Sequence, residues 1–331
     1  MMPLGTYLAR SSVRSACVDD CFSTLTGPLQ QIPSAIVDAS ASAVERLWPG
    51  RRPKVTLLSG GITNLNFKVE VDGAAYVLRM GGAQTGLLGI DRAVEHAASL
   101  RAEEIGVGPA VVDFVPSEGW LVARFIDGHP IPPKEMRSPA MMARVAEALK
   151  KLHSAAAIPG RFDAHAVVDE YLAEAESHGV EIPEEFAAAH AISERIRAAR
   201  GPQPLVPCHN DLLNANFLDD GQIRIVDWEY AGMGDRFFDL ANFSVNHEFG
   251  VEDDGRLLAA YFGKEREADL AALRLMRFMS DFREAMWGVL QSGISELDFD
   301  FKGYASKHFD RLDRTAADPE FAEYLRTVGN S

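Results

Sequence analysis

Hydrophobic and polar residues alternate in the N-terminal third of the chain. In residues 67–71, Phe and Val are separated by Lys and Glu, which is the pattern of a strand with one buried face. Asp72-Gly73 follows, and residues 75–80 form a second, mostly apolar run. A strand, an Asp-Gly pair and another strand together predict an antiparallel hairpin.

Residues 91–105 instead repeat apolar positions at helical spacing. The next segment, 106–109, contains two Gly and one Pro, which end a helix. Residues 110–114 and 120–125 are again short apolar runs and predict two more strands. The N-terminal part is therefore predicted to be β-rich with one helix.

Past a Gly- and Pro-containing segment at residues 127–133, the pattern becomes helical. Apolar spacing predicts a helix that ends at His153, two helices within residues 162–200, and helices from Phe237 to near the end of the chain. Ahead of the last stretch, three prolines indicate a loop: Pro202, Pro204 and Pro207.

These patterns divide the chain into three parts. We expect residues 1–30 to be a loosely ordered extension, residues 31–126 to form a small antiparallel β-rich N-lobe, and residues 127–331 to form a larger α-rich C-lobe. The predicted fold class is α+β, with two lobes.

The 331-residue chain carries 33 basic and 48 acidic residues, a net charge of −15. This balance argues against nucleic acid or an anionic membrane as partners, because both attract clustered Lys and Arg. It does not exclude a nucleotide-binding enzyme, since local cations and Mg²⁺ can offset the global charge. An acidic surface also favours a cationic small molecule as partner. The sequence leaves the oligomeric state open.

Cysteine usage and hydropathy predict a cytoplasmic protein. Only three cysteines are present, Cys17, Cys21 and Cys208, which is typical of reduced thiols. No apolar run reaches the length of a membrane span, and the N-terminal residues lack the apolar core of a secretory signal.

A cluster of polar residues in the second half of the chain carries the candidate chemistry. Asp211 and Asn216 lie in a polar loop, and Asp227 follows the short predicted strand 222–226. A turn at residues 219–221 folds this segment back toward the loop. The three oxygen-bearing side chains are therefore expected to lie together at the opening of one site. Carboxylate and amide oxygens suit Mg²⁺, and one carboxylate remains to orient a hydroxyl nucleophile. The pattern predicts phosphoryl transfer.

Two segments here resemble a known family. The spacing H-x-D-x₄-N in residues 209–216, followed by a strand and Asp227, matches the kinase catalytic loop and its metal-binding Asp. This loop sequence, with Asp-Trp-Glu-Tyr at residues 227–230, resembles the choline/ethanolamine kinase family. That family is related to aminoglycoside phosphotransferases, so the resemblance implies a protein-kinase-like fold, ATP as phosphoryl donor and Mg²⁺.

Within the loop, the resemblance implies a role for each polar residue. Asp211 would be the catalytic base or would orient the acceptor hydroxyl, with Asn216 as the second catalytic residue. Asn216 and Asp227 would hold Mg²⁺. His209 would brace the loop, and Asp239 would tie it to the helix that follows.

The N-lobe is similar to the nucleotide site of the same family. The Gly-containing loop at residues 59–64 would approach the phosphates, Arg79 takes the place of the kinase strand lysine, and Glu95 would be its ion-pair partner. Residues 123–126 would be the hinge that offers backbone groups to adenine. The nucleotide-binding residues so implied are Ser59, Gly60, Asn64, Arg79, Glu95, Arg124, Phe125 and Asp227.

The C-terminal part resembles the segment that builds the family's choline pocket. A quaternary ammonium needs aromatic faces, because it cannot donate hydrogen bonds. Glu284 stands where the family commonly has a second Trp, a change that would suit ethanolamine or another amine better than choline. The acceptor-binding residues so implied are Asp211, Glu229, Glu284, Trp287 and Tyr304. We interpret the chain as an ATP-dependent phosphotransferase for a small amino alcohol, with choline or ethanolamine as the leading candidates.

Two other functions stay open. The first is an aminoglycoside or other small-molecule amine or sugar kinase on the same fold, with a broad acceptor pocket lined by carboxylates. Candidates for that lining are Glu229, Glu248, Glu252, Asp253 and Glu284. The second is a non-catalytic nucleotide-binding scaffold, which the presence of both Asp211 and Asp227 disfavours.

Overall fold

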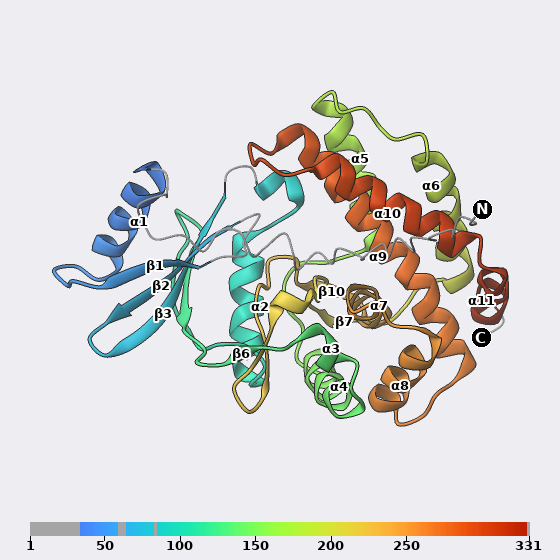
Figure 1. Ribbon diagram of the computed structural model, residues 1–331, viewed down its shortest axis with the longest axis horizontal. Helices are drawn as coiled ribbons and strands as arrows, with labels where there is room; N and C mark the ends of the chain where they lie inside the picture. The colour runs from blue at the N-terminus through green and yellow to red at the C-terminus, as the bar shows by residue number, and fades with distance from the viewer. Residues whose placement is uncertain (1–33, 59–63, 83–84, 330–331) are drawn as a thin grey trace, which may run out of the picture.

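A five-stranded antiparallel sheet forms one end of the molecule, with its strands in the order β1-β2-β3-β5-β4 (Figure 1). The structure is a computed structural model that describes residues 34–58, 64–82 and 85–329. The strands are β1 (Lys54–Leu58), β2 (Asn64–Val71), β3 (Ala74–Gly81), β4 (Val111–Val115) and β5 (Trp120–Arg124). Two α-helices accompany them, α1 (Ser34–Leu47) and α2 (Arg92–Glu104). The predicted hairpin, strands and helix of this region are confirmed.

The turn between β2 and β3 has the geometry that its sequence predicts. Asp72 and Gly73 both have positive φ, 52° and 78°, as a type I′ hairpin turn requires. The turn sets the register, in which Asn66 on β2 lies opposite Arg79 on β3. A two-residue turn thus determines where Arg79 stands in the sheet.

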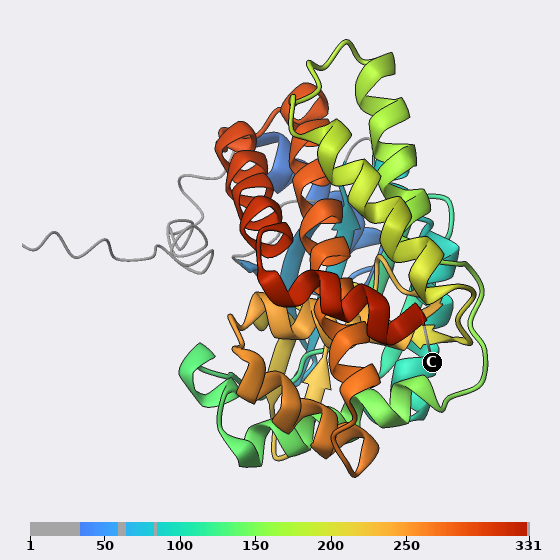
Figure 2. The ribbon, with the colours of Figure 1, turned by 90° about the vertical axis from the view of Figure 1, so that its right-hand side faces the viewer.

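The rest of the chain is mostly helical. Its helices are α3 (Pro133–Met136), α4 (Pro139–His153), α5 (Ala164–Ser177), α6 (Phe186–Arg200), α7 (Arg236–Asn246), α8 (Val251–Phe262), α9 (Glu267–Ile294), α10 (Phe301–Ala316) and α11 (Pro319–Gly329). The long α9 packs against α5, α7, α10 and α11, and Figure 2 shows this helical end from the front. One buried apolar cluster joins α1 to the sheet, and a larger one joins the helices. These features confirm the predicted α+β class.

Short strands shape the region between the sheet and the helices. β6 (His129–Pro130), β8 (Phe217–Asp219) and β9 (Ile223–Ile225) form one small sheet, and β7 (Leu205–Cys208) pairs with β10 (Gly232–Asp235). The expectation of a loop through Pro207 is therefore wrong. Pro207 has no N–H to donate, but a strand of a two-stranded ribbon has an unpaired side that tolerates proline. β7 ends directly before His209 and so positions the polar loop.

The pairing of β6 with β8 supports the boundary that we propose between residues 126 and 127. Residues from 129 onward are thereby attached to the helical part. Cys17, Cys21 and the predicted extension lie outside the described residues, and Cys208 is a buried free thiol. None of the described helices combines the length and the hydropathy that a bilayer-spanning segment requires.

Candidate active site

The loop between β7 and β8 carries Asp211 and is fastened by His209. The Nδ1 of His209 accepts a hydrogen bond from the Asp211 N–H (3.2 Å), so its Nε2 donates to the carbonyl of Val226 (3.0 Å). Burial lowers the pKa of His209, which agrees with a neutral ring. Because Val226 precedes Asp227, one imidazole ties the two acidic residues of the site together.

Asp239 on α7 holds the backbone of the same loop through hydrogen bonds. Its Oδ2 accepts hydrogen bonds from the backbone N–H of His209 (2.9 Å) and from Nε2 of His153 (3.0 Å). Its Oδ1 accepts from the N–H of Asn210 (2.7 Å), a residue whose φ of 66° lies in the left-handed region. The fully buried carboxylate thus fixes an unusual backbone bend immediately before Asp211.

Asn216 and Asp227 present oxygen atoms that fit a metal ion. The Nδ2 of Asn216 donates to the Asp211 carbonyl (2.8 Å), and its Oδ1 has no hydrogen bond with any described residue. Asp227 binds Arg79 through Oδ1 (2.6 Å), while its Oδ2 is likewise free within the described part of the chain. An amide oxygen and a carboxylate oxygen form a hard donor set that suits Mg²⁺.

Arg79 on β3 is held by three carboxylates from distant parts of the chain. Its guanidinium lies 2.7 Å from Glu95, 2.6 Å from Asp227 and 2.9 Å from Glu229. Burial opposes the charge of Arg79, but the three carboxylates outweigh burial and raise its pKa. Arg79 therefore stays charged and connects the sheet to the turn that carries Asp227. The predicted ion pair between Arg79 and Glu95 is present, at 2.7 Å.

Arg92, at the start of α2, completes the same cluster. Its guanidinium lies 2.6 Å from Glu95 and donates to Oδ1 of Asn64 at 2.7 Å. The Nδ2 of Asn64 in turn donates to Glu229 at 2.8 Å. Two arginines thus meet three carboxylates where nucleotide phosphates are expected. This negative excess is the kind that a bound divalent cation offsets.

Glu229 lies elsewhere than the sequence predicts. We expected it beside the acceptor, but its buried carboxylate faces Arg79 and Asn64. The residue follows Asp227 by two positions, and the left-handed backbone of Asp227 (φ 69°) redirects the chain at this point. Glu229 therefore belongs to the cluster around Arg79 and Arg92.

The predicted hinge uses its backbone donors within the protein. The N–H of Arg124 donates to Ala110 (2.8 Å), and the N–H of Phe125 donates to Ala75 (3.1 Å). An adenine contact from these two residues would consequently use their carbonyl groups. Ser59 and Gly60, also predicted to bind nucleotide, lie outside the described residues.

Helices α9 and α10 bring the predicted acceptor residues together. The indole N–H of Trp287 donates to the Tyr230 hydroxyl (3.2 Å), and the Tyr304 hydroxyl donates to Glu284 (2.7 Å). The rings of Trp287 and Tyr304 pack edge to face, with centroids 5.6 Å apart. The guanidinium of buried Arg283 lies over the Tyr230 ring, 4.3 Å from its centroid. Aromatic faces, a carboxylate and a cation are therefore contiguous.

Arg283 joins this acceptor group to the catalytic loop. Its Nη1 forms an ion pair with Glu284 and lies 3.6 Å from Oδ1 of Asp211. Burial raises the pKa of Asp211 to about 8, with Arg283 opposing the shift and Glu284 adding to it. Burial acts on Glu284 in the same direction, but Arg283 overrides it and lowers that pKa. A further cation would therefore favour ionised Asp211.

Comparison with known proteins connects this geometry to a family. The phosphotransferase enzyme family matches residues 54–276. The crystal structure of a choline/ethanolamine kinase family protein from Mesorhizobium loti is 33% identical, with a TM-score of 0.78 over 89% of this chain and 100% of that chain. The chain belongs to the choline/ethanolamine kinase family of phosphotransferases.

Other relatives agree with this assignment. Ethanolamine kinase 1 from Mus musculus is 25% identical over 80% of this chain and 84% of its own length. A thermostable mutant of an aminoglycoside phosphotransferase shares the fold, with a TM-score of 0.60 at 20% identity over 84% of this chain and 99% of that chain. The chain is a small-molecule kinase with a protein-kinase-like fold.

Two residues of this phosphotransferase were missed in the sequence. Arg92 was signalled only by its i,i+3 spacing to Glu95 on α2. Arg283 had no signal, because an arginine that is only 2% exposed is uncommon. Tyr230 was not missed: the family resemblance puts it beside the acceptor pocket, and its hydroxyl contacts Trp287.

The carboxylates expected in a broad aminoglycoside-type pocket of this phosphotransferase lie apart. Glu252 and Asp253 on α8 pair with Arg256, at 3.0 and 2.6 Å. Glu248 lies 3.7 Å from a different arginine. Of the five, only Glu284 contacts the aromatic group of α9 and α10. The arrangement gives that alternative no support.

Replacing Asp239 by asparagine should destabilise the fold by about 2–4 kcal/mol, because the amide cannot accept the hydrogen bonds of both loop N–H groups and of His153. Urea unfolding monitored by circular dichroism measures the loss. Asp298→Asn, at an exposed position, is the matched control and should stay within about 0.5 kcal/mol of the parent. Equal stability of the two variants would show that Asp239 does not brace the loop.

Proposed function

We propose that this chain transfers the γ-phosphoryl group of ATP to the hydroxyl of a small amino alcohol, with ethanolamine or choline as the leading acceptors. The observation that carries the proposal is the position of Asp211. Its backbone carbonyl accepts a hydrogen bond from Asn216, His209 connects it to the residue before Asp227, and its carboxylate lies beside Arg283, which pairs with Glu284. The printed names of the relatives, ethanolamine kinase and choline/ethanolamine kinase, point to the same class of acceptor.

In this proposal the residues position the two substrates rather than form covalent intermediates. Mg²⁺ held by Asn216 and Asp227 would supply charge neutralisation at the nucleotide phosphates. Arg79 keeps Asp227 in place, and His209 keeps Asp227 in register with the loop. Asp211 accepts a hydrogen bond from the acceptor hydroxyl and takes its proton as the oxygen attacks.

Charge balance supports a singly charged cationic acceptor. The acceptor side holds two carboxylates, Asp211 and Glu284, and one guanidinium, Arg283. With Asp211 ionised, as a bound cation favours, this leaves one negative charge in a buried environment, which one ammonium group offsets. The faces of Trp287 and Tyr304 would stabilise the same ammonium by cation–π interactions.

A coupled assay of ADP release tests the proposal directly. With Mg·ATP as donor, the panel contains ethanolamine, choline, other small amino alcohols, thiamine and several aminoglycosides. We expect turnover with ethanolamine or choline that far exceeds turnover with the aminoglycosides. Turnover with aminoglycosides alone would overturn the acceptor class and leave the phosphoryl-transfer chemistry standing.

Replacing Trp287 by leucine should raise KM for the amine about tenfold, because one cation–π wall is removed, while kcat changes little. Steady-state kinetics with saturating Mg·ATP measure both constants. Trp287→Phe retains an aromatic face and is the control, with KM expected within about threefold of the parent. If the leucine variant keeps the parent KM, Trp287 is a packing residue and the acceptor binds elsewhere.

A further inference from the structure

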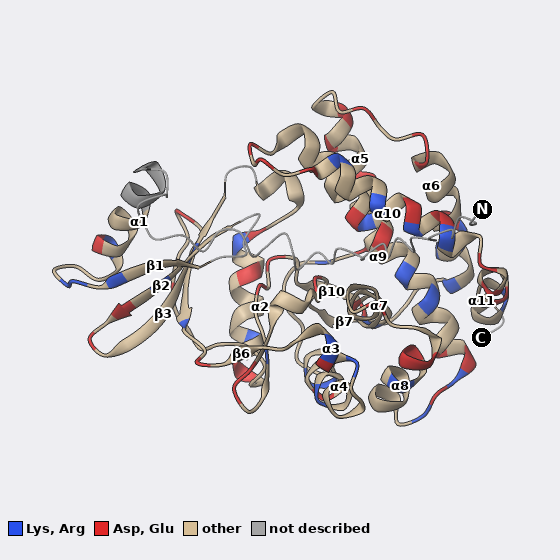
Figure 3. Cartoon of the chain, viewed as in Figure 1, with Lys and Arg blue, Asp and Glu red and all other residues tan. Residues whose placement is uncertain are grey.

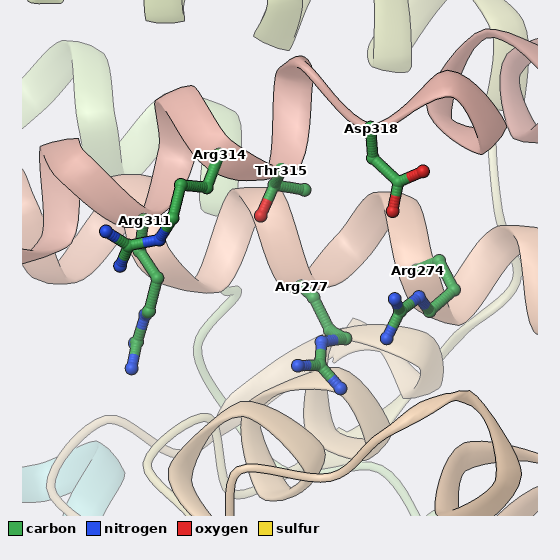
Figure 4. Close-up of a pocket in the computed structure, with 6 residues that line it drawn as sticks. All are labelled: Arg274, Arg277, Arg311, Arg314, Thr315 and Asp318. Atoms are coloured by element: carbon green, nitrogen blue, oxygen red, sulfur yellow. The ribbon is translucent and has the colours of Figure 1, made fainter. Parts of the chain in front are cut away.

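Four arginines surround a cavity of about 180 Å³ away from the residues described above. Arg274 and Arg277 come from α9, and Arg311 and Arg314 come from α10, with Thr315 and Asp318 completing the lining (Figure 4). Basic segments on α9 and α10 also lie near one another in the charge view (Figure 3). None of these six residues belongs to the candidate active site described above.

Two buried carboxylates hold three of the guanidiniums in place. Asp254 lies 2.9 Å from Arg274 and 3.1 Å from Arg277, and Asp281 forms an ion pair with Arg311. Both aspartates are almost completely buried. Side chains anchored in this way lose less conformational entropy when they bind a ligand.

The cavity keeps a positive excess in an acidic protein. Arg314 forms no ion pair or hydrogen bond with the described residues, and the cavity wall itself adds one carboxylate, Asp318. The lining thus holds four guanidiniums and one carboxylate, while Asp254, Asp281 and, through the Tyr324 hydroxyl, Glu320 balance the guanidiniums from outside it, in a chain whose net charge is −15. Such an excess at one concave place is a local attraction for an anion.

Hydrogen-bond donors also remain available there. Arg277 uses a single nitrogen, Nη1, for Asp254, for the Ser244 hydroxyl (2.6 Å) and for the Phe249 carbonyl (2.8 Å). Its Nε and Nη2 bind no described residue. Burial lowers the pKa of Arg277; Asp254 and Asp281 oppose this shift, and Arg274 and Arg311 add to it.

We propose that this cavity binds a small phosphate-bearing anion, such as a phosphate monoester. Guanidinium groups bind phosphate through paired, charge-assisted hydrogen bonds, and the Thr315 hydroxyl adds another donor. The volume accommodates a phosphate group with a short substituent, whereas a nucleic acid would need a long basic surface that this acidic chain lacks. The inference does not rest on the proposed function.

The cavity shares no residue with the nucleotide and acceptor groups. Its lining residues form no ion pair or hydrogen bond with Asp211, Asp227 or Arg79 in the described structure, and it adjoins the acceptor group through His308, which binds Asp281 and packs on the Tyr304 ring. Arg277 precedes Glu284 by seven residues on α9, about 10 Å along the helix axis. Binding there can consequently be measured without turnover.

Isothermal titration calorimetry of the full chain with inorganic phosphate and with glycerol 3-phosphate tests the proposal. EDTA is present, so that no metal-dependent binding at the candidate active site contributes. The variant is Arg314→Glu, at an exposed position with no described partner, where the fold should be preserved. Arg195→Glu, an exposed arginine on α6 that does not line the cavity, is the matched control for the loss of two charge units.

We expect binding to the parent protein that weakens at least about tenfold in Arg314→Glu and less than about twofold in Arg195→Glu. Absence of binding to the parent up to about 10 mM would overturn the proposal, leaving the arginines as structural partners of Asp254 and Asp281. Equal weakening in the two variants would overturn it as well, because the effect would then be one of overall charge. Neither result bears on whether the chain phosphorylates an amino alcohol.

Discussion

Replacing Asp211 by asparagine is expected to lower kcat by about 10²–10⁴-fold, the range that removal of a positioned general base produces. The amide has the same shape, so the hydrogen bond from the Asp211 N–H to His209 and the course of the loop are retained. What is lost is the carboxylate that receives the hydroxyl proton. Affinity for Mg·ATP should stay within about threefold, because the nucleotide contacts that we propose lie on Asp227 and Arg79.

Single-turnover kinetics and fluorescence titration of a nucleotide analogue separate these two effects. Asp220→Asn, an exposed carboxylate in the turn between β8 and β9, is the control and should retain parental kcat. A variant of Asp211 that turns over at the parental rate would remove the proposed mechanism, whatever its effect on binding. A variant that loses nucleotide binding and rate together would assign Asp211 to the fold of the loop.

Much of the fold could be predicted because its signals are local. A two-residue hairpin turn needs two positive φ values. Asp and Gly tolerate such values, and both Asp72 and Gly73 have them. The candidate catalytic loop could be recognised from the spacing of His209, Asp211 and Asn216, followed by a strand and Asp227. In contrast, β7 and β10 carry Pro and Gly residues, and only their pairing with each other makes them strands.

The site was harder to predict where a residue acts through distant partners. Arg79 and Glu95 were expected to pair because they occupy the positions of the strand lysine and the helix glutamate that pair in kinases. The sequence does not say that Glu229 turns toward Arg79, since that depends on the backbone of Asp227. Nor does it say that Arg283 reaches Asp211, because the two are brought together by the packing of α9 against α7, the helix whose Asp239 holds the loop.

Replacing Asp227 by asparagine should abolish most of the Mg²⁺ dependence of nucleotide binding. The parent protein is expected to bind ATP about 10²-fold more tightly with Mg²⁺ than in EDTA, since a bound divalent ion contributes several kcal/mol of charge stabilisation. In the variant the carboxylate oxygen offered to the metal is gone, and this ratio should fall to within about threefold of unity. Arg79 also loses one of its three carboxylates, so metal-free binding of ATP should not weaken.

The control for this prediction is Glu229→Gln, because Glu229 contacts the same guanidinium as Asp227, at 2.9 Å, without offering an oxygen to the proposed metal. Both substitutions remove one negative charge from the Arg79 cluster. Calorimetric titration of ATP with and without Mg²⁺ should therefore leave the ratio of affinities large in Glu229→Gln and small in Asp227→Asn. If both variants keep the parental ratio, Mg²⁺ is not held by Asp227. If both lose it, the charge of the cluster, rather than a ligand at Asp227, controls metal binding.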